Sequence, residues 1–340
     1  MELKVWHGDW GLPSIDHHCL AVMAYCKFSE APVTLTKCGN PWKSPSGELP
    51  VLKHDKALMT KVNEIFNYLR QNRWGLDHEL TTKQCADIVA FTALIEDKLV
   101  PALLYLWWVD SKTYLELTRP WFSSRLPFPL NFYLPLKKHK DYVNYLNQAY
   151  NADNLTETER EQKVYKDAKE CLNILSSKLG NKDYFFGNSP SSLDAVVFGY
   201  LAPLLKAPFP NTVLQTHLKS CHDLTRYCER ILSKYFPLTP EEETELRKSE
   251  EERRHQQTDI SEFPNKRRNM MIAGAVALTA MMGYAFLSGL IEIKIVDEDK
   301  NENGTNLSRS YDAFHDVLGD DDDDDGSNPG SKQDGQEGNE

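Results

Sequence analysis

The sequence lacks most of the motifs that mark a catalytic or metal-binding protein. It contains no CxxC pair, no HExxH, no paired-carboxylate motif and no phosphate-binding glycine loop. Its seven cysteines are scattered and odd in number, which fits reduced thiols in a cytosol-facing protein better than a disulfide framework. The ten histidines show no metal-ligand spacing. We therefore expect no metal, no cofactor and no catalytic residue of these classes.

Targeting signals are also missing from the start of the chain. Residues Met1 to Trp10 contain Glu2 and Asp9 but no arginine, unlike a secretory signal or an amphipathic transit peptide. Instead, the run Met270 to Ile291 has no charge over 22 residues. Such a run makes a helix of about 33 Å, which is enough to cross a bilayer. It predicts a single C-terminal transmembrane helix over 270–291.

The charges around this run predict its orientation. Three basic residues precede it, namely Lys266, Arg267 and Arg268, and acidic residues follow it. Basic flanks prefer the cytoplasmic side, so the large N-terminal part is expected in the cytosol.

The acidity of the chain lies in its tail. Residues 292–340 hold 16 acidic and 4 basic residues, whereas the preceding residues hold 34 acidic and 35 basic ones. This tail includes six aspartates, Asp320 to Asp325, and is predicted to be disordered. Asn303 and Asn306 open glycosylation acceptor motifs, so a tail inside the endoplasmic reticulum remains an alternative. The near-neutral main part predicts no nucleic-acid partner.

Two folded regions are predicted before the apolar run. Residues 1–75 show the order β-α-β-β-β-α, with Ser14 as the expected cap of the first helix and Pro50 at the head of a strand. Residues 76–236 show helical periodicity, and capping boxes predict helix starts at Thr156 and Ser191. Residues 237–269 are highly charged and predict a flexible linker with transient helix.

This plan resembles the glutathione transferase-like fold, which joins a thioredoxin-like βαβββα domain to an all-helical domain. The Leu49-Pro50 pair is similar to the cis-proline of thioredoxin-like domains. The stretch Phe186 to Ala195, with Ser191 and Asp194, resembles the capping motif of that superfamily's central helix. The resemblance therefore implies structural roles for Pro50, Ser191 and Asp194.

Several separate blocks resemble the metaxin family more closely, over residues 1 to about 236. They are Trp10-Gly11-Leu12-Pro13-Ser14, Asn40-Pro41-Trp42, Ser44-Pro45-Ser46-Gly47, Pro127 to Phe132 and Phe185 to Leu205. The resemblance implies a subunit of the import and β-barrel sorting and assembly machinery of the mitochondrial outer membrane. Implied partners are a second metaxin, the barrel-forming core subunit and the lipid bilayer, with the tail in the intermembrane space. An adaptor that links mitochondria to transport machinery is an alternative, and the long acidic tail departs from the family pattern.

An anchored glutathione transferase-like enzyme is the other alternative, and two positions argue against it. Such enzymes activate a thiol with a Tyr, Ser or Cys near the first helix, where only Ser14 offers a hydroxyl. Their Glu-Ser pair that binds the glutamyl end of glutathione aligns with Lys61 and Val62. A lost polar partner costs on the order of 1–3 kcal/mol, so the resemblance implies that the peptide is no longer bound.

The segment Leu126 to Leu136 is a candidate contact surface. Its three prolines predict an irregular loop, and a basic cluster follows at once. Such a loop could rest on a membrane or on another subunit, or it could simply fill a gap between helices. The candidate contact residues are Phe128, Phe132, Tyr133, Lys137 and Lys138.

Overall fold

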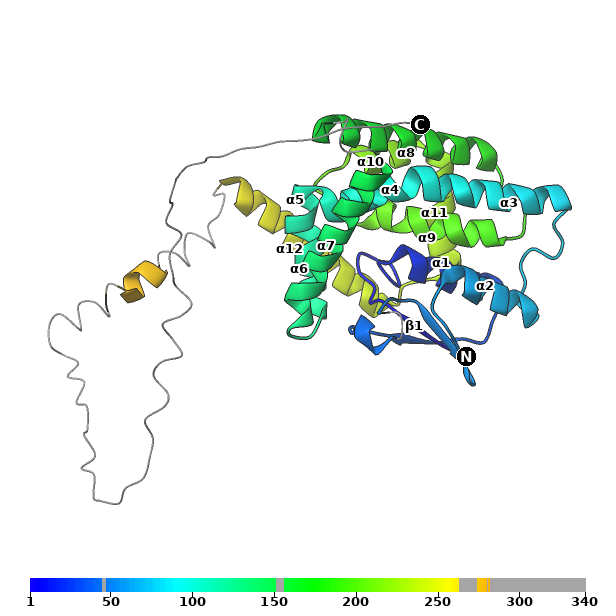
Figure 1. The fold of residues 1–340 in the computed structure, drawn as a ribbon, viewed down its shortest axis with the longest axis horizontal. Coiled ribbons are helices and arrows are strands. Elements are labelled where there is room, and N and C mark those ends of the chain that lie inside the picture. Colours follow the sequence, from blue (N-terminus) through cyan, green and yellow to red (C-terminus); the bar gives the residue numbers. More distant parts are fainter. Residues whose placement is uncertain (45–46, 151–155, 263–273, 280, 282–340) are drawn as a thin grey trace, which may run out of the picture. The chain divides into compact units, whose positions relative to one another are not determined.

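The computed structural model describes residues 1–44, 47–150, 156–262, 274–279 and 281. Residues Met1–Phe263 form one compact unit, which we call the folded unit. Its first part has the expected order, confirming the βαβββα prediction (Figure 1). The elements are β1 (Glu2–Val5), α1 (His17–Phe28), β2 (Thr34–Lys37), a 3₁₀ turn η1 (Pro41–Lys43), β3 (Val51–His54), β4 (Ala57–Met59) and α2 (Val62–Gln71).

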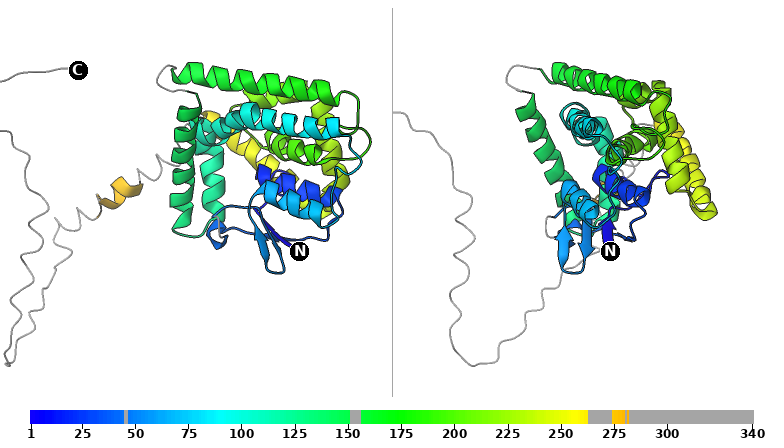
Figure 2. Two further views of the ribbon diagram at one scale, coloured as in Figure 1. Left: turned by 45° about the vertical axis from the view of Figure 1, so that its right-hand side comes forward. Right: turned by 90° about the vertical axis from the view of Figure 1, so that its right-hand side faces the viewer.

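The four strands form one mixed sheet in the order β2-β1-β3-β4. Strand β1 is parallel to β2, with Leu3 opposite Leu35, and antiparallel to β3, with Leu3 opposite Leu52. Leu3 and Leu52 are fully buried because they face the helices that cover the sheet. In both views of Figure 2, α1 and α2 lie between the sheet and the helices of the second part.

The second part is helical, as predicted. A long helical segment comprises α3 (Thr82–Leu94), η2 (Ile95–Leu99), α4 (Val100–Leu104) and η3 (Tyr105–Val109), and a second one comprises α5 (Ser111–Thr113), η4 (Tyr114–Thr118) and α6 (Arg119–Arg125). Each segment has a π-helical turn just before a proline, η2 before Pro101 and η4 before Pro120. A π-helical turn is wider than an α-helical one, so the helix is widened at these places. The remaining helices are α7 (Leu130–Ala149), α8 (Glu157–Leu179), α9 (Ser192–Lys206), α10 (Val213–Ser220) and α11 (His222–Tyr235).

Helix α1 is buried almost all round because it lies between the sheet and α9. Eight consecutive residues, Cys19 to Cys26, are buried. The two helices approach closely at Gly199, where an added Cβ would lie 2.6 Å from the His17 carbonyl oxygen and 2.8 Å from the Ala21 Cβ. Only glycine at this position of α9 allows this separation, so Gly199 joins the two parts of the unit.

The loop expected over Leu126 to Leu136 is wrong, because α7 begins at Leu130 and contains Pro135. A proline in a helix leaves the carbonyl four residues earlier without its N–H partner. Here that carbonyl belongs to Asn131, and the Ser123 Oγ of α6 donates to it at 3.0 Å. A tertiary hydrogen bond thus replaces the missing helical one.

Part of the stretch 237–269, predicted as a flexible linker with transient helix, is helical in the described residues. Helix α12 covers Pro240–Glu262. Thr239 and Glu242 form a capping box, in which the Glu242 carboxylate accepts from the Thr239 N–H at 2.9 Å. A Leu246 methyl also lies 3.3 Å from the place of a Cβ on Gly11, so α12 packs on the loop after β1. Local capping and this contact stabilise the helix.

The predicted membrane segment falls largely outside the described residues. Within 270–291 the structure describes 274–279 and 281, which are helical, and it does not describe the flank Lys266, Arg267 and Arg268 or the tail 292–340. Among the residues it does describe, no helix combines the length and the apolar character that crossing a bilayer requires.

Candidate functional site

The start of α1 is where a transferase would activate its thiol, and here it is closed. The expected Ser14 cap is wrong, because Asp16 caps the helix and accepts from the Cys19 N–H at 2.8 Å. Ser14 instead accepts a long hydrogen bond of 3.4 Å from the Asp16 N–H. Ser14 is 0% exposed. A thiol in solution cannot reach this hydroxyl.

The start of α2 offers no hydroxyl either. Lys61 occupies the cap position with extended backbone and makes no capping hydrogen bond through its side chain, and Val62 is the first helical residue. The Lys61 ammonium lies 3.8 Å from the Glu64 carboxylate in an exposed ion pair. A glutamyl group placed here would meet a lysine and an apolar side chain.

Tryptophans pack against the loop after β1, and residues 8–13 of this loop also line a groove of about 660 Å³. The Trp10 ring lies 5.9 Å from that of Trp107 and 6.4 Å from that of Trp121, and we call these three residues the aromatic plug. Asp9 fixes the plug, because its carboxylate accepts from the Trp121 indole N–H at 2.9 Å and pairs with Arg125 at 3.3 Å. The plug therefore joins the β1 loop to α6 through buried contacts.

Cysteine chemistry is not favoured at this site. All seven cysteines are free thiols. Burial raises the pKa of Cys19 well above its usual range, and it raises that of Cys26 to about 12. A nucleophilic cysteine needs a lowered pKa and access to solvent, and these two thiols have neither.

The candidate contact residues fall into two groups. Phe128, Phe132 and Tyr133 are exposed at 81%, 62% and 53%. Two further residues are exposed that were not among the predicted contact residues. They are Leu136 of α7, at 62%, and Trp42 of η1, at 57%. The Trp42 ring lies 6.3 Å from that of Tyr133, and the Phe128 ring lies 6.4 Å from that of Phe132. We call these five residues the aromatic face.

The two lysines of the prediction point in different directions. Lys137 is exposed, whereas Lys138 is half-buried and its ammonium lies 5.9 Å from the Trp108 ring centre and 5.7 Å from that of Tyr142. Burial alone would lower the pKa of Lys138, but Tyr142, Glu48 and Asp16 together raise it. Lys138 thus remains charged while its ammonium lies beside two rings of the unit, and its role as a contact residue stays a prediction.

The three motif residues lie within the framework of the fold. The Leu49-Pro50 peptide bond is cis. The Asp194 carboxylate accepts from the Ser191 N–H at 2.8 Å, the Ser191 hydroxyl at 2.6 Å and the Phe185 N–H at 3.1 Å. Burial raises the pKa of Asp194 to about 6, although these hydrogen bonds favour the carboxylate. Tyr227 adds a hydrogen bond of 2.9 Å to the Asp194 carbonyl, a contact that α11 brings from far along the sequence.

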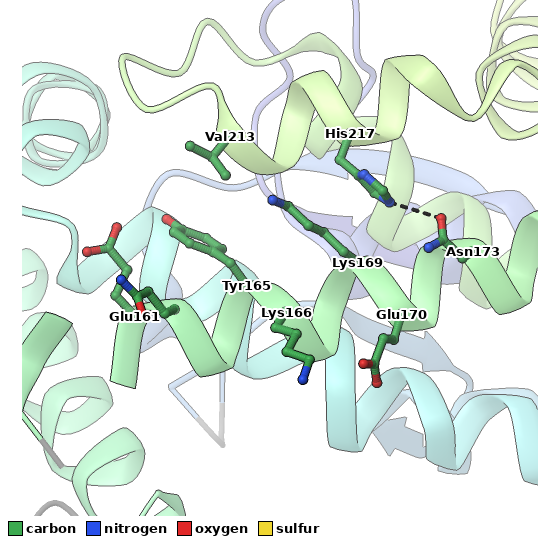
Figure 3. A pocket seen from close by; sticks show the side chains of 9 residues that line it. Glu161, Tyr165, Lys166, Lys169, Glu170, Asn173, Val213 and His217 are labelled. Carbon is green, nitrogen blue, oxygen red and sulfur yellow. Dashed lines mark hydrogen bonds between the residues drawn. The ribbon is translucent and has the colours of Figure 1, made fainter. Parts of the chain in front are cut away.

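A groove of about 550 Å³ lies between α8 and α10 (Figure 3). Its lining side chains include charged ones of both signs, and the His217 imidazole lies 3.0 Å from the Asn173 side-chain oxygen. No nucleophile with an adjacent base lines it. Within the described parts of the chain, no group of three or more His, Cys, Asp or Glu side chains is placed to hold a metal ion.

Comparison with known proteins places the chain in a family. Residues 19–139 match the Tom37 family, "Outer mitochondrial membrane transport complex protein", and residues 168–231 match the C-terminal domain of glutathione S-transferases. Glutathione transferase F2 from Populus trichocarpa is 11% identical, with a TM-score of 0.45, covering 73% of this chain and 99% of that one.

Two similar relatives are metaxins. Metaxin-1 from Macaca fascicularis is 42% identical over 297 residues, covering 86% of this chain and 92% of its own. Metaxin-3 from Xenopus laevis is 44% identical over 237 residues, covering 69% of this chain and 77% of its own. Identity at this level over most of both chains reflects common descent, and the chain belongs to the metaxin family.

Proposed function

We propose that this chain is a non-enzymatic, cytosol-facing docking subunit of a complex that imports proteins into the mitochondrial outer membrane and sorts and assembles its β-barrel proteins. The family description of a transport complex protein of that membrane supports this role. The observation that carries the non-enzymatic part is the closed site, where Ser14 is buried and Trp10 packs into the aromatic plug. Burial of Ser14 leaves the start of α1 without the accessible hydroxyl that would activate glutathione, which supports this part of the proposal.

The partners in this proposal are a second metaxin, the barrel-forming core subunit and the lipid bilayer. Residues 270–291 would provide the membrane anchor, with Lys266, Arg267 and Arg268 on the cytosolic side and the tail in the intermembrane space. Protease added to intact mitochondria should then remove the folded unit and leave the tail protected. A shift in gel mobility on endoglycosidase treatment would contradict this location.

The decisive experiment purifies the full-length chain from mitochondria under mild detergent and identifies the polypeptides that accompany it. We expect a second metaxin and a barrel-forming protein. The same preparation should neither bind glutathione nor conjugate it to 1-chloro-2,4-dinitrobenzene. Saturable conjugation that Ser14→Ala removes would defeat the proposal in favour of a transferase.

A further inference from the structure

The aromatic face comes from two parts of the fold. Helix α7 buries Leu130 and Leu134 against the unit and presents Phe132 and Leu136 to solvent. The turn before α7 adds Phe128, and η1 adds Trp42 beside Tyr133. An apolar patch assembled from separate segments is typical of an interaction surface, whereas single exposed apolar residues are ordinary.

The charge along this part of the chain is mainly positive, with Glu116 and Asp141 directly at its two ends. From Leu117 to Lys140 the chain contains five basic residues and no acidic one. Lys137 and Lys140 are both exposed, and they follow Tyr133 and Leu136 by four residues. Residues four apart lie on the same side of a helix, so each lysine lies one turn behind an exposed apolar residue.

This arrangement fits a lipid surface better than a protein. The cores of protein interfaces are depleted in lysine, whereas the charged residues beside this face are lysines. Aromatic rings settle at the headgroup level of a bilayer, and lysines near an anionic surface each add attraction. The order along α7, with aromatic side chains first and lysines one turn later, matches rings that enter the interface and ammonium groups that remain at the phosphates.

We propose that the aromatic face, with Lys137 and Lys140, lies on the surface of a bilayer that contains anionic lipid. This inference rests on the proposed function, which holds the folded unit at a membrane. The face would orient the unit on the bilayer and leave its other surfaces to protein partners.

The test replaces Phe132 by the photocrosslinker benzoylphenylalanine in the full-length chain. A matched control carries it at Val89 of α3, which is 70% exposed and lies outside the aromatic face. The purified chains are reconstituted into phosphatidylcholine vesicles with or without phosphatidylinositol and irradiated. Lipid adducts are then measured by mass spectrometry, and circular dichroism checks that each chain is folded.

We expect lipid adducts at position 132, few at position 89, and fewer at 132 without phosphatidylinositol. Lys137→Glu and Lys140→Glu should each weaken the contact at least about fivefold, the effect of one lysine at an anionic surface. Equal yields at the two positions, or no lipid adduct at 132, would overturn the proposal. So would an adduct at 132 in intact mitochondria that contains a protein and no lipid. Because copurification of partners does not depend on these adducts, the two proposals can fail separately.

Discussion

Large aromatic side chains gather in two regions of the folded unit, with opposite outcomes. In the aromatic plug, Trp10, Trp107 and Trp121 pack together beside the β1 loop, and an Asp9 hydrogen bond fixes the group. In the aromatic face, Phe128 and Phe132 remain in solvent. Both regions are rich in large aromatic side chains. The burial of the rings and the charges around them decide whether such a group stabilises the fold or remains available for contact.

The plug also joins the two parts of the folded unit. The β1 loop supplies Trp10, and the helical part supplies Trp107 and Trp121 as partners for its ring. Because Trp10 and Trp121 are buried by these contacts, the plug stabilises the packing of one part on the other. The aromatic face also joins the two parts, through Trp42 and Tyr133, but both rings are exposed.

The sharpest contrast compares one tryptophan from each region. Trp10→Ala removes a buried ring and should lower the free energy of unfolding by about 3–5 kcal/mol. Trp42→Ala should change it by less than about 0.5 kcal/mol, because the Trp42 ring is largely exposed. Urea unfolding of the full-length chain in detergent, followed by circular dichroism, measures both. Equal losses would erase the distinction between the plug and the face.

The buried carboxyl of Asp194 should make the free energy of unfolding depend on pH, whereas exposed lysines should not. The folded pKa of Asp194, about 6, lies above the ordinary carboxyl value of about 4. Between these values the folded chain holds a proton that the unfolded chain has lost, so stability falls as pH rises from 4 to 6. Relative to the non-titrating Asp194→Asn variant, the native chain should lose about 2–3 kcal/mol across this range. A difference between the two proteins that does not change with pH would contradict the buried carboxylate.

Gly199→Ala tests the close packing of α1 on α9. Within an isolated helix, this change would be stabilising, because alanine is favoured over glycine. Here the new methyl would meet the His17 carbonyl and Ala21, so we expect a loss of about 1–3 kcal/mol. The sign of the change in melting temperature decides the matter. A higher melting temperature would show that the two helices can separate at low cost.

The smallest expected effect concerns α12. Leu246→Ala should weaken the contact with the loop at Gly11 and speed proteolysis within 240–262, with a loss of about 1 kcal/mol or less in local stability. Lys248→Ala, at an exposed position of the same helix, is the matched control. Limited proteolysis with mass spectrometry compares the two. The same cleavage rate in both variants would show that α12 persists by capping alone.

Local sequence information was sufficient for the order of the elements and for the residues that open α2. Apolar periodicity and caps involve residues close together in the chain, so the βαβββα order, the helical part and the starts at Thr156 and Ser191 could be predicted directly. The lysine and valine at the start of α2 could also be assigned, because position in a helix follows from the nearby sequence.

Features that depend on distant partners became visible only in the folded chain. Pro135 lies inside a helix because Ser123 supplies the missing donor, and α12 packs on the β1 loop through Leu246. Two further contacts join segments that are far apart in the chain. Lys138 lies over the Trp108 ring, and the Trp42 ring lies beside that of Tyr133. Local propensity carries no information about such contacts, because their free energy arises only when folding brings the partners together.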